Sequence, residues 1–167
     1  RNALQISAEL DRLGASLTGG SDVDTSRLGV SALKSTLTPA VELLADLVKN
    51  PAFSESELER VRKQRLESIS QEMAQPIGLA LRFLPPLIYG EEHPYGIPFS
   101  GRGNTESVEA ITRADLLSFR EKWLRPDNAT IFAAGDSTLA ELKPLLESAI
   151  GDWEAPATAK GSKSEVA

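Results

Sequence analysis

Apolar residues recur every three to four positions in six stretches of the chain, which is the spacing of amphipathic helices. In the first stretch Leu4, Leu10 and Leu13 contribute to one helical face, and Gly14 follows at the position of a C-terminal cap. Pro76 separates two of the later stretches, because proline breaks a helix or starts a new one. The spacing predicts helices over residues 3–13, 39–49, 54–75, 77–89, 112–124 and 138–150.

Helix-capping residues stand at several of these predicted starts. In a capping box, a Ser or Thr and an acidic residue three positions later each bind the other's backbone N–H. Thr38 and Pro39 suit the cap and the first turn of the helix at 39–49. Capping boxes are expected at Ser54 with Glu57, Thr112 with Asp115, and Thr138 with Glu141.

Two segments carry strand patterns instead. In residues 15–35, Leu28 and Val30 alternate with polar or small residues beside a turn-rich DVDTS, which predicts a hairpin. Residues 128–134 (NATIFAA) are apolar and lie between a proline and a glycine, which predicts a further strand.

These elements together predict an α+β fold with an antiparallel-rich sheet and helices packed on one of its faces. Residues 15–35 and 128–134 should share that sheet. The helices at 39–49 and 54–75 should cover one face, because their apolar stripes must be buried. Residues 90–104 are rich in Gly and Pro and predict a loop.

The composition is ordinary for a soluble globular protein, with 41% hydrophobic and 25% charged residues. A net charge of −6 disfavours nucleic acid and anionic membranes, and no run of eighteen apolar residues exists to span a bilayer. The chain has no cysteine and thus no disulfide or thiolate metal site. We expect a domain over residues 1–153 and a linker over 154–167, cut from a longer protein because residue 1 is Arg and already has a helical pattern.

Five stretches in a fixed order resemble the insulinase, pitrilysin and processing-peptidase family of zinc peptidases, family M16. They are AELDRLGASL at 8–17, LLADLVKNPAFSESELERVRKQRL at 43–66, LIYGEEHPYGIPFSG at 87–101, ITRADLLSF at 111–119 and RPDNATIFAAGD at 125–136. The chain is most similar to the second, metal-lacking half of some bacterial two-half members. The resemblance implies part of an M16 half-domain, with the metallohydrolase fold of LuxS and the processing peptidases.

The resemblance also implies a zinc site that this chain does not supply. Active members need an HxxEH helix, whose two His bind zinc and whose Glu acts as base, plus a Glu on a later helix. No HxxEH is present, and the later ligand position is occupied by Ser68, whose neutral hydroxyl is a poor zinc ligand. Glu67 lies about 100° around the helix and Glu72 about 6 Å along it, so rescue by either is not expected. We predict no metal, no cofactor and no catalytic residue here, and zinc only in the partner half.

Other candidate sites have simpler interpretations. His93 is the only histidine, and it has two interpretations: a metal ligand or catalytic base, or a loop residue that fixes a turn by hydrogen bonding. The turn residue is favoured, because zinc sites need several converging ligands. Asp22 and Asp24 suit a solvated turn better than a calcium loop, since the Gly and closing Glu of such a loop are missing. Ser100 is not in a GxSxG elbow, and Gly101 precedes no phosphate-loop lysine.

Two functions remain open. In the first, the chain is the non-catalytic half of a two-half metalloendopeptidase and helps to enclose a peptide together with a homologous HxxEH-bearing half. In the second, it is an interaction or scaffold module, like the respiratory-complex subunits that share the fold. The sequence upstream of Arg1 would discriminate between them, and the resemblance makes the periplasm the first expectation for the compartment. Possible peptide contacts are Arg60, Arg62, Arg65, His93 and Tyr95, although the basic residues are also typical of a solvated helix face.

Overall fold

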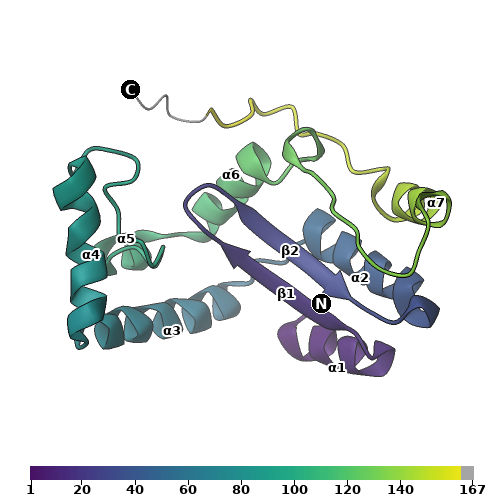
Figure 1. Cartoon of the computed structure of the whole chain (residues 1–167), viewed down its shortest axis with the longest axis horizontal. Coiled ribbons are helices and arrows are strands. Elements are labelled where there is room, and N and C mark those ends of the chain that lie inside the picture. Colours follow the sequence, from purple (N-terminus) through teal and green to yellow (C-terminus); the bar gives the residue numbers. More distant parts are fainter. Residues whose placement is uncertain (163–167) are drawn as a thin grey trace. The chain divides into compact units, whose positions relative to one another are not determined.

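A computed structural model describes residues 1–162, and it is an α+β structure as predicted. Figure 1 shows its helices and the two strands, which form one hairpin. Short 3-10 helices at Lys34–Thr36 and Pro126–Asn128 complete the described elements. These elements are α1 (Ala3–Leu13), β1 (Ser16–Ser21), β2 (Ser26–Ser31), α2 (Leu37–Lys49), α3 (Glu55–Met73), α4 (Pro76–Tyr89), α5 (Thr105–Ala110), α6 (Arg113–Trp123) and α7 (Leu139–Ile150).

The chain divides into two compact units, each with its own packing. The first comprises Arg1–Gly20, Ser26–Ala52 and Phe119–Lys160. The second comprises Ser21–Thr25, Phe53–Ser118 and, of the described residues, Gly161 and Ser162.

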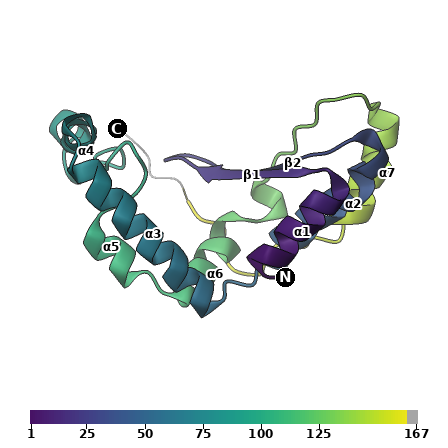
Figure 2. The same cartoon turned by 90° about the horizontal axis from the view of Figure 1, so that it is seen from below.

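Helix α2 is the centre of the first unit. Its buried residues include Ala40 and Leu43, which are 0% and 3% exposed. The helix packs against α7, β2 and α1. In Figure 2, α1 and α2 lie beneath the hairpin, so helices cover one face of the sheet. This part of the predicted architecture is confirmed.

Helix α3 is the centre of the second unit and packs against α4 and α5. Ile69, only 2% exposed, is its most buried apolar residue. The predicted apolar stripe is only partly buried, because Val61 and Met73 are each 46% exposed. Thus α3 buries its stripe against two helices of its own unit, and the expectation that the helix at 54–75 covers the sheet together with 39–49 is wrong.

Most predicted caps are present. Gly14 ends α1 with φ 58°, and the capping box of Thr138 with Glu141 opens α7. Thr112 and Asp115 also bind each other's backbone N–H groups at the start of α6. The expected box at Ser54 is wrong, because its side chain makes no capping hydrogen bond. The expected cap at Thr38 is also wrong, because α2 begins at Leu37 and Thr38 lies within it.

The expected strand at residues 128–134 is wrong. After the 3-10 helix that ends at Asn128, the chain continues to Gly135 without regular structure. Ile131 is 54% exposed and Phe132 91% exposed. A strand needs a neighbour for its backbone hydrogen bonds, and the sheet in the described residues contains β1 and β2 alone. The expectation that 128–134 shares the hairpin's sheet is therefore also wrong.

No helix within residues 1–162 is long and apolar enough to cross a membrane.

Candidate functional site

Ser68, at the ligand position implied by the family pattern, lies half-buried on α3. Its hydroxyl donates a hydrogen bond to the backbone carbonyl of Gln64 at 2.8 Å. This is the common back-bond of a serine to the residue one turn earlier in a helix. The proton of Ser68 is thus used within the helix, as expected for a neutral hydroxyl.

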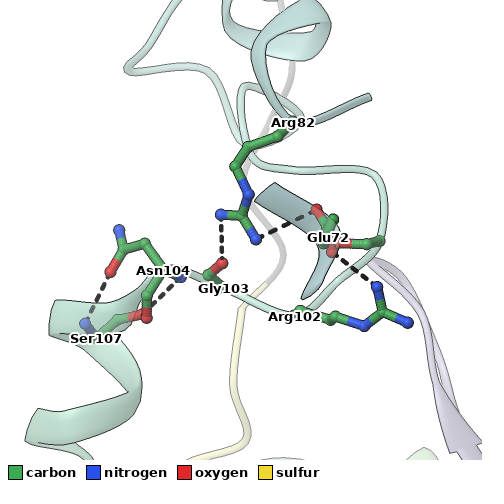
Figure 3. Close-up of polar contacts among 7 residues, drawn as sticks. Glu72, Arg82, Arg102, Gly103, Asn104 and Ser107 are labelled. Atoms are coloured by element: carbon green, nitrogen blue, oxygen red, sulfur yellow. Dashed lines mark hydrogen bonds and ion pairs between the residues drawn. The ribbon is translucent and has the colours of Figure 1, made fainter. Parts of the chain in front are cut away.

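Glu72, one turn beyond Ser68, lies at the centre of a polar cluster that we call the Glu72 clasp (Glu72, Arg82, Ser100 and Arg102). The carboxylate is 8% exposed. Arg102 Nη1 donates to Oε2 at 2.8 Å, and Ser100 Oγ donates to Oε1 at 3.2 Å. Arg82 Nη2 lies 3.2 Å from Oε1 as an ion pair (Figure 3). Both carboxylate oxygens are therefore engaged.

Arg82 extends the clasp to the segment that precedes α5. Its guanidinium, on α4, is also 8% exposed and donates from Nη1 to the Gly103 carbonyl at 2.8 Å. The next residue, Asn104, forms a capping box with Ser107 at the start of α5 (Figure 3). The clasp thus joins the end of α3, the middle of α4 and the segment leading into α5.

The clasp keeps Glu72 ionised. Burial by itself raises the pKa of this carboxyl, but the hydrogen bonds from Arg102 and Ser100 and the charges of both arginines outweigh burial. The net effect lowers the pKa of Glu72 below its ordinary value. A carboxylate held between two guanidinium groups is a structural ion pair, so Glu72 does not replace the missing zinc ligand.

His93 and Tyr95 belong to an aromatic cluster at the end of α4. The His93 ring stacks on Tyr89 with centroids 5.2 Å apart. Tyr95 and Phe99 approach Tyr89 edge-on, at 6.0 and 6.4 Å. Nδ1 of His93 accepts a hydrogen bond from the backbone N–H of Tyr95 at 3.0 Å. This geometry agrees with His93 as a residue that fixes a turn.

The turn interpretation also fits Asp22 and Asp24. One Asp22 oxygen accepts the backbone N–H groups of Asp24 and Thr25 at 2.9 and 2.7 Å. The Asp24 carboxylate accepts the Tyr95 hydroxyl at 3.0 Å. The bonds to Asp22 are typical of an Asx turn, whereas the bond from Tyr95 joins Asp24 to the 90–104 segment.

The three arginines that were expected to contact peptide differ in their surroundings. Arg62 is 14% exposed in its side chain and donates to the carbonyls of Val108, Glu109 and Ile111 at the end of α5. Arg60 binds Glu57 and Gln64 on its own helix, and Arg65 is exposed. Within residues 1–162, no hydrogen bond or ion pair joins these arginines to His93 or Tyr95. The structure therefore does not bring the five candidates together.

A shallow, open pocket of about 440 Å³ lies between α3 and α5. Its lining is mainly apolar and contains one carboxylate and no histidine. The lining residues are Leu66, Ile69, Ser70, Met73, Thr105 and Glu109. It has the character of a groove for an apolar group, without an acid–base pair or a nucleophile activated by a base.

The Glu72 clasp was missed by sequence reasoning, which considered Glu72 only as a substitute metal ligand. One signal was available: Arg82 is the only charged residue between Pro76 and Gly90. A lone charge in an apolar helix is buried only when it is paired. The partners of Arg82, Glu72 and Gly103, lie ten and 21 residues away and could not be identified from spacing.

The comparisons with known proteins identify the family. The family model described as insulinase (peptidase family M16) matches residues 1–88. The model described as peptidase M16 inactive domain matches residues 110–166. The chain belongs to peptidase family M16.

Two curated relatives differ in role. An uncharacterized zinc protease of Mycobacterium tuberculosis is 33% identical over 137 residues, which cover 81% of this chain and 30% of that protein. Subunit 1 of the mitochondrial cytochrome b-c1 complex of Bos taurus is 28% identical over 148 residues, or 87% of this chain and 29% of that protein. The chain thus spans about 30% of the length of these relatives.

Solved structures show the same fold. A peptidase M16 inactive domain from Pseudomonas fluorescens superposes with a TM-score of 0.88 at 24% identity, covering 99% of this chain and 39% of that one. The first half of the periplasmic protease PqqL from Escherichia coli gives a TM-score of 0.70 at 16% identity, covering 89% and 31%. The chain is an M16 peptidase-like domain, and the inactive-domain match agrees with the prediction of a non-catalytic one.

The zinc ion that the family implies does not fit the residues present. In residues 1–162 no group of three or more His, Cys, Asp or Glu side chains is placed to hold a metal ion. Ser68 is bound to the Gln64 carbonyl, and Glu72 is bound to two arginines. We therefore derive no chemical step that passes through a metal in this chain.

Proposed function

We propose that this chain forms part of the wall of a peptide-enclosing chamber in a two-half zinc metalloendopeptidase, and that it takes no part in the chemical step. The observation that carries the proposal is Ser68. It occupies the implied ligand position, and its hydroxyl is bound to the carbonyl of Gln64. Hydrolysis of the family type needs a metal-activated water and a base beside it. Residues 1–162 contain no group of side chains placed for a metal-activated water with a base beside it.

The partner in this proposal is a homologous M16 half that carries HxxEH and binds the zinc. Such a half belongs to the same polypeptide or to a partner subunit. The likeness to one half of a periplasmic protease supports an arrangement in two halves and, with the family resemblance, the periplasm as the compartment. The family unit would comprise residues 1–153, and 154–167 would act as a linker.

The peptide contacts that we propose lie on two surfaces. The first is the aromatic cluster at the end of α4, where Tyr89 and Phe99 are 45% and 46% exposed beside His93 and Tyr95. Exposed aromatic rings bind apolar side chains with little loss of conformational entropy. The second is formed by the basic residues Arg60 and Arg65 of α3, which lie about 140° apart around the helix and would each attract a separate acidic group. Arg62 contributes less, because its guanidinium is used at the end of α5.

A peptidase assay on three samples tests the proposal: this chain, the full-length protein, and the full-length protein with Ser68→Ala. We expect chelator-sensitive hydrolysis in the two full-length samples alone, with rates within about twofold of each other, since a substitution outside the reacting groups leaves transition-state binding intact. Chelator-sensitive hydrolysis by this chain would refute the proposal. A loss of several orders of magnitude on Ser68→Ala would show that Ser68 acts in the chemistry.

A second candidate function is an interaction or scaffold module without protease activity. The similarity to a subunit of the cytochrome b-c1 complex favours it. The two functions differ in the sequence upstream of Arg1: a preceding half with HxxEH supports the protease, whereas its absence, together with an inactive full-length protein, supports the scaffold.

A further inference from the structure

The loop between α4 and α5, residues 90–104, lacks regular secondary structure apart from turns, yet contacts hold it at both ends. At its beginning, the rings of His93 and Tyr95 pack on Tyr89. The backbone closes into a tight turn, in which the N–H of Gly96 donates to the His93 carbonyl at 2.7 Å. At its end, the side chains of Ser100 and Arg102 bind Glu72.

The two attachments are of different kinds. The contacts at the beginning of the loop are partly exposed ring contacts and an exposed hydrogen bond from the Tyr95 hydroxyl to Asp24. The clasp at the end of the loop is directional, because each bond joins a defined donor to one oxygen of a buried carboxylate. The end of the loop is therefore fixed more firmly than its beginning, and the fixed end limits the positions that the aromatic residues can take.

Glu72 is the member of the clasp on which the others depend. Without its charge, two guanidinium groups would remain together with no anion between them. Arg82 would lose its ion pair with Glu72 and keep one hydrogen bond, from Nη1 to the Gly103 carbonyl, because its Nε and Nη2 have no hydrogen-bond partner within residues 1–162. Arg102, whose side chain is 41% exposed, would be free to turn towards solvent.

We propose that Glu72 is a positioning residue: through Arg102, Ser100 and Arg82 it fixes the 90–104 loop, and so places His93 and Tyr95 for contact with a bound peptide. The peptide part of this inference rests on the proposed function. The expected ligand of the loop is a peptide segment that presents an apolar or aromatic side chain to the exposed rings.

Hydrogen exchange in the full-length protein tests the structural part. The variant is Glu72→Gln, and Glu67→Gln is the matched control, because it makes the same change at an exposed position of the same helix. The backbone N–H groups of Gly96 and Gly101 are hydrogen-bonded within the loop. In Glu72→Gln we expect them to exchange at least about tenfold faster, while the amides of α2 keep their rates.

Arg102→Gln provides a second, milder variant in case Glu72→Gln does not fold. Its native side chain is partly exposed, so its loss leaves a smaller buried defect. It should accelerate exchange at the same two glycines. If Gly96 and Gly101 exchange at the parent's rate in folded Glu72→Gln or folded Arg102→Gln, the clasp does not fix the loop and the proposal is refuted.

Peptide kinetics test the functional part. If the loop binds peptide equally in the ground state and the transition state, loosening it raises KM and leaves kcat unchanged. We expect KM to rise by about tenfold in Glu72→Gln, kcat to stay within about twofold, and Glu67→Gln to match the parent. Faster exchange with an unchanged KM overturns the link between the loop and peptide. No activity in the unmodified full-length protein overturns the proposed function instead and leaves the exchange result to decide on the clasp.

Discussion

At the scale of single residues, a serine and a carboxylate one turn apart have opposite environments. Ser68 satisfies its hydroxyl within its own helix, whereas Glu72 binds groups from α4 and the loop after it. The hydrogen bond of the Ser68 hydroxyl stays within α3. Glu72 connects three segments.

Restoring a carboxylate at position 68 should not restore a zinc site. In Ser68→Glu the new side chain would be a single ligand, while zinc sites use at least three protein ligands. We expect less than about 0.1 zinc per chain after dialysis at neutral pH, both in this chain and in the variant. Metal analysis by mass spectrometry measures this ratio, and a value near one for either protein would contradict the prediction.

The contribution of Glu72 to stability should depend on pH. Its pKa is lowered in the folded state, so its contribution is complete above the unfolded pKa of about 4.3 and is lost as the pH falls through the lower, folded pKa. The difference in unfolding free energy between the parent and Glu72→Gln should be largest near pH 7 and should close at low pH. Urea denaturation at pH 7, 5 and 3 measures it. A difference that does not change with pH would exclude an ionised Glu72 as the cause.

Gly78 allows α4 to approach the end of α3. A Cβ on this residue would lie 2.2 Å from the Glu72 carbonyl oxygen. Gly→Ala in a helix usually stabilises by about 1 kcal/mol, but here we expect a loss of about 1–3 kcal/mol, because the helices must move apart. The matched control is Gly20→Ala, where a Cβ meets nothing within 4 Å. Equal denaturation midpoints for parent and Gly78→Ala would refute the close approach.

At the scale of elements, the sequence predicted most of the helices correctly, whereas the strand predicted at 128–134 is absent from the described residues. The local spacing of apolar residues predicts six of the helices: α1, α2, α3, α4, α6 and α7. Three of the predicted caps are also local, because each lies within a few residues of the groups it binds. Helix α5 was missed because its six residues are too few to show a period. Residues 128–134 have the composition of a strand, but pairing depends on residues far away in sequence. The Glu72 clasp was missed for the same reason.

The exposed position of Phe132 predicts that this residue contributes little to the stability of the chain as it stands. We expect Phe132→Ser to change the unfolding free energy by less than about 0.5 kcal/mol, since its side chain has almost no burial to lose. Leu43→Ala should cost about 2–5 kcal/mol, because Leu43 is 3% exposed in the core of the first unit. Thermal or urea unfolding compares the two. A large loss for Phe132→Ser would mean that the segment is paired in solution.

At the scale of the whole molecule, family membership and fold agree. Residues 1–88 and 110–166 match two successive family models, and the chain spans about 30% of its relatives. The family could be predicted from five ordered stretches, because order along a chain is specific even when each stretch is not.

The role of Arg62 at the end of α5 changes what mutations on the basic face can reveal. A helix as short as α5 does not persist without tertiary contacts, and Arg62 satisfies three carbonyls at its C-terminal end. Of the three arginines, Arg60 and Arg65 then remain, about 140° apart around α3, so one peptide cannot lie along both. Weaker peptide affinity in Arg62→Ala would therefore report the melting of a helix, and the two outer arginines, replaced one at a time, are the cleaner probes of charge.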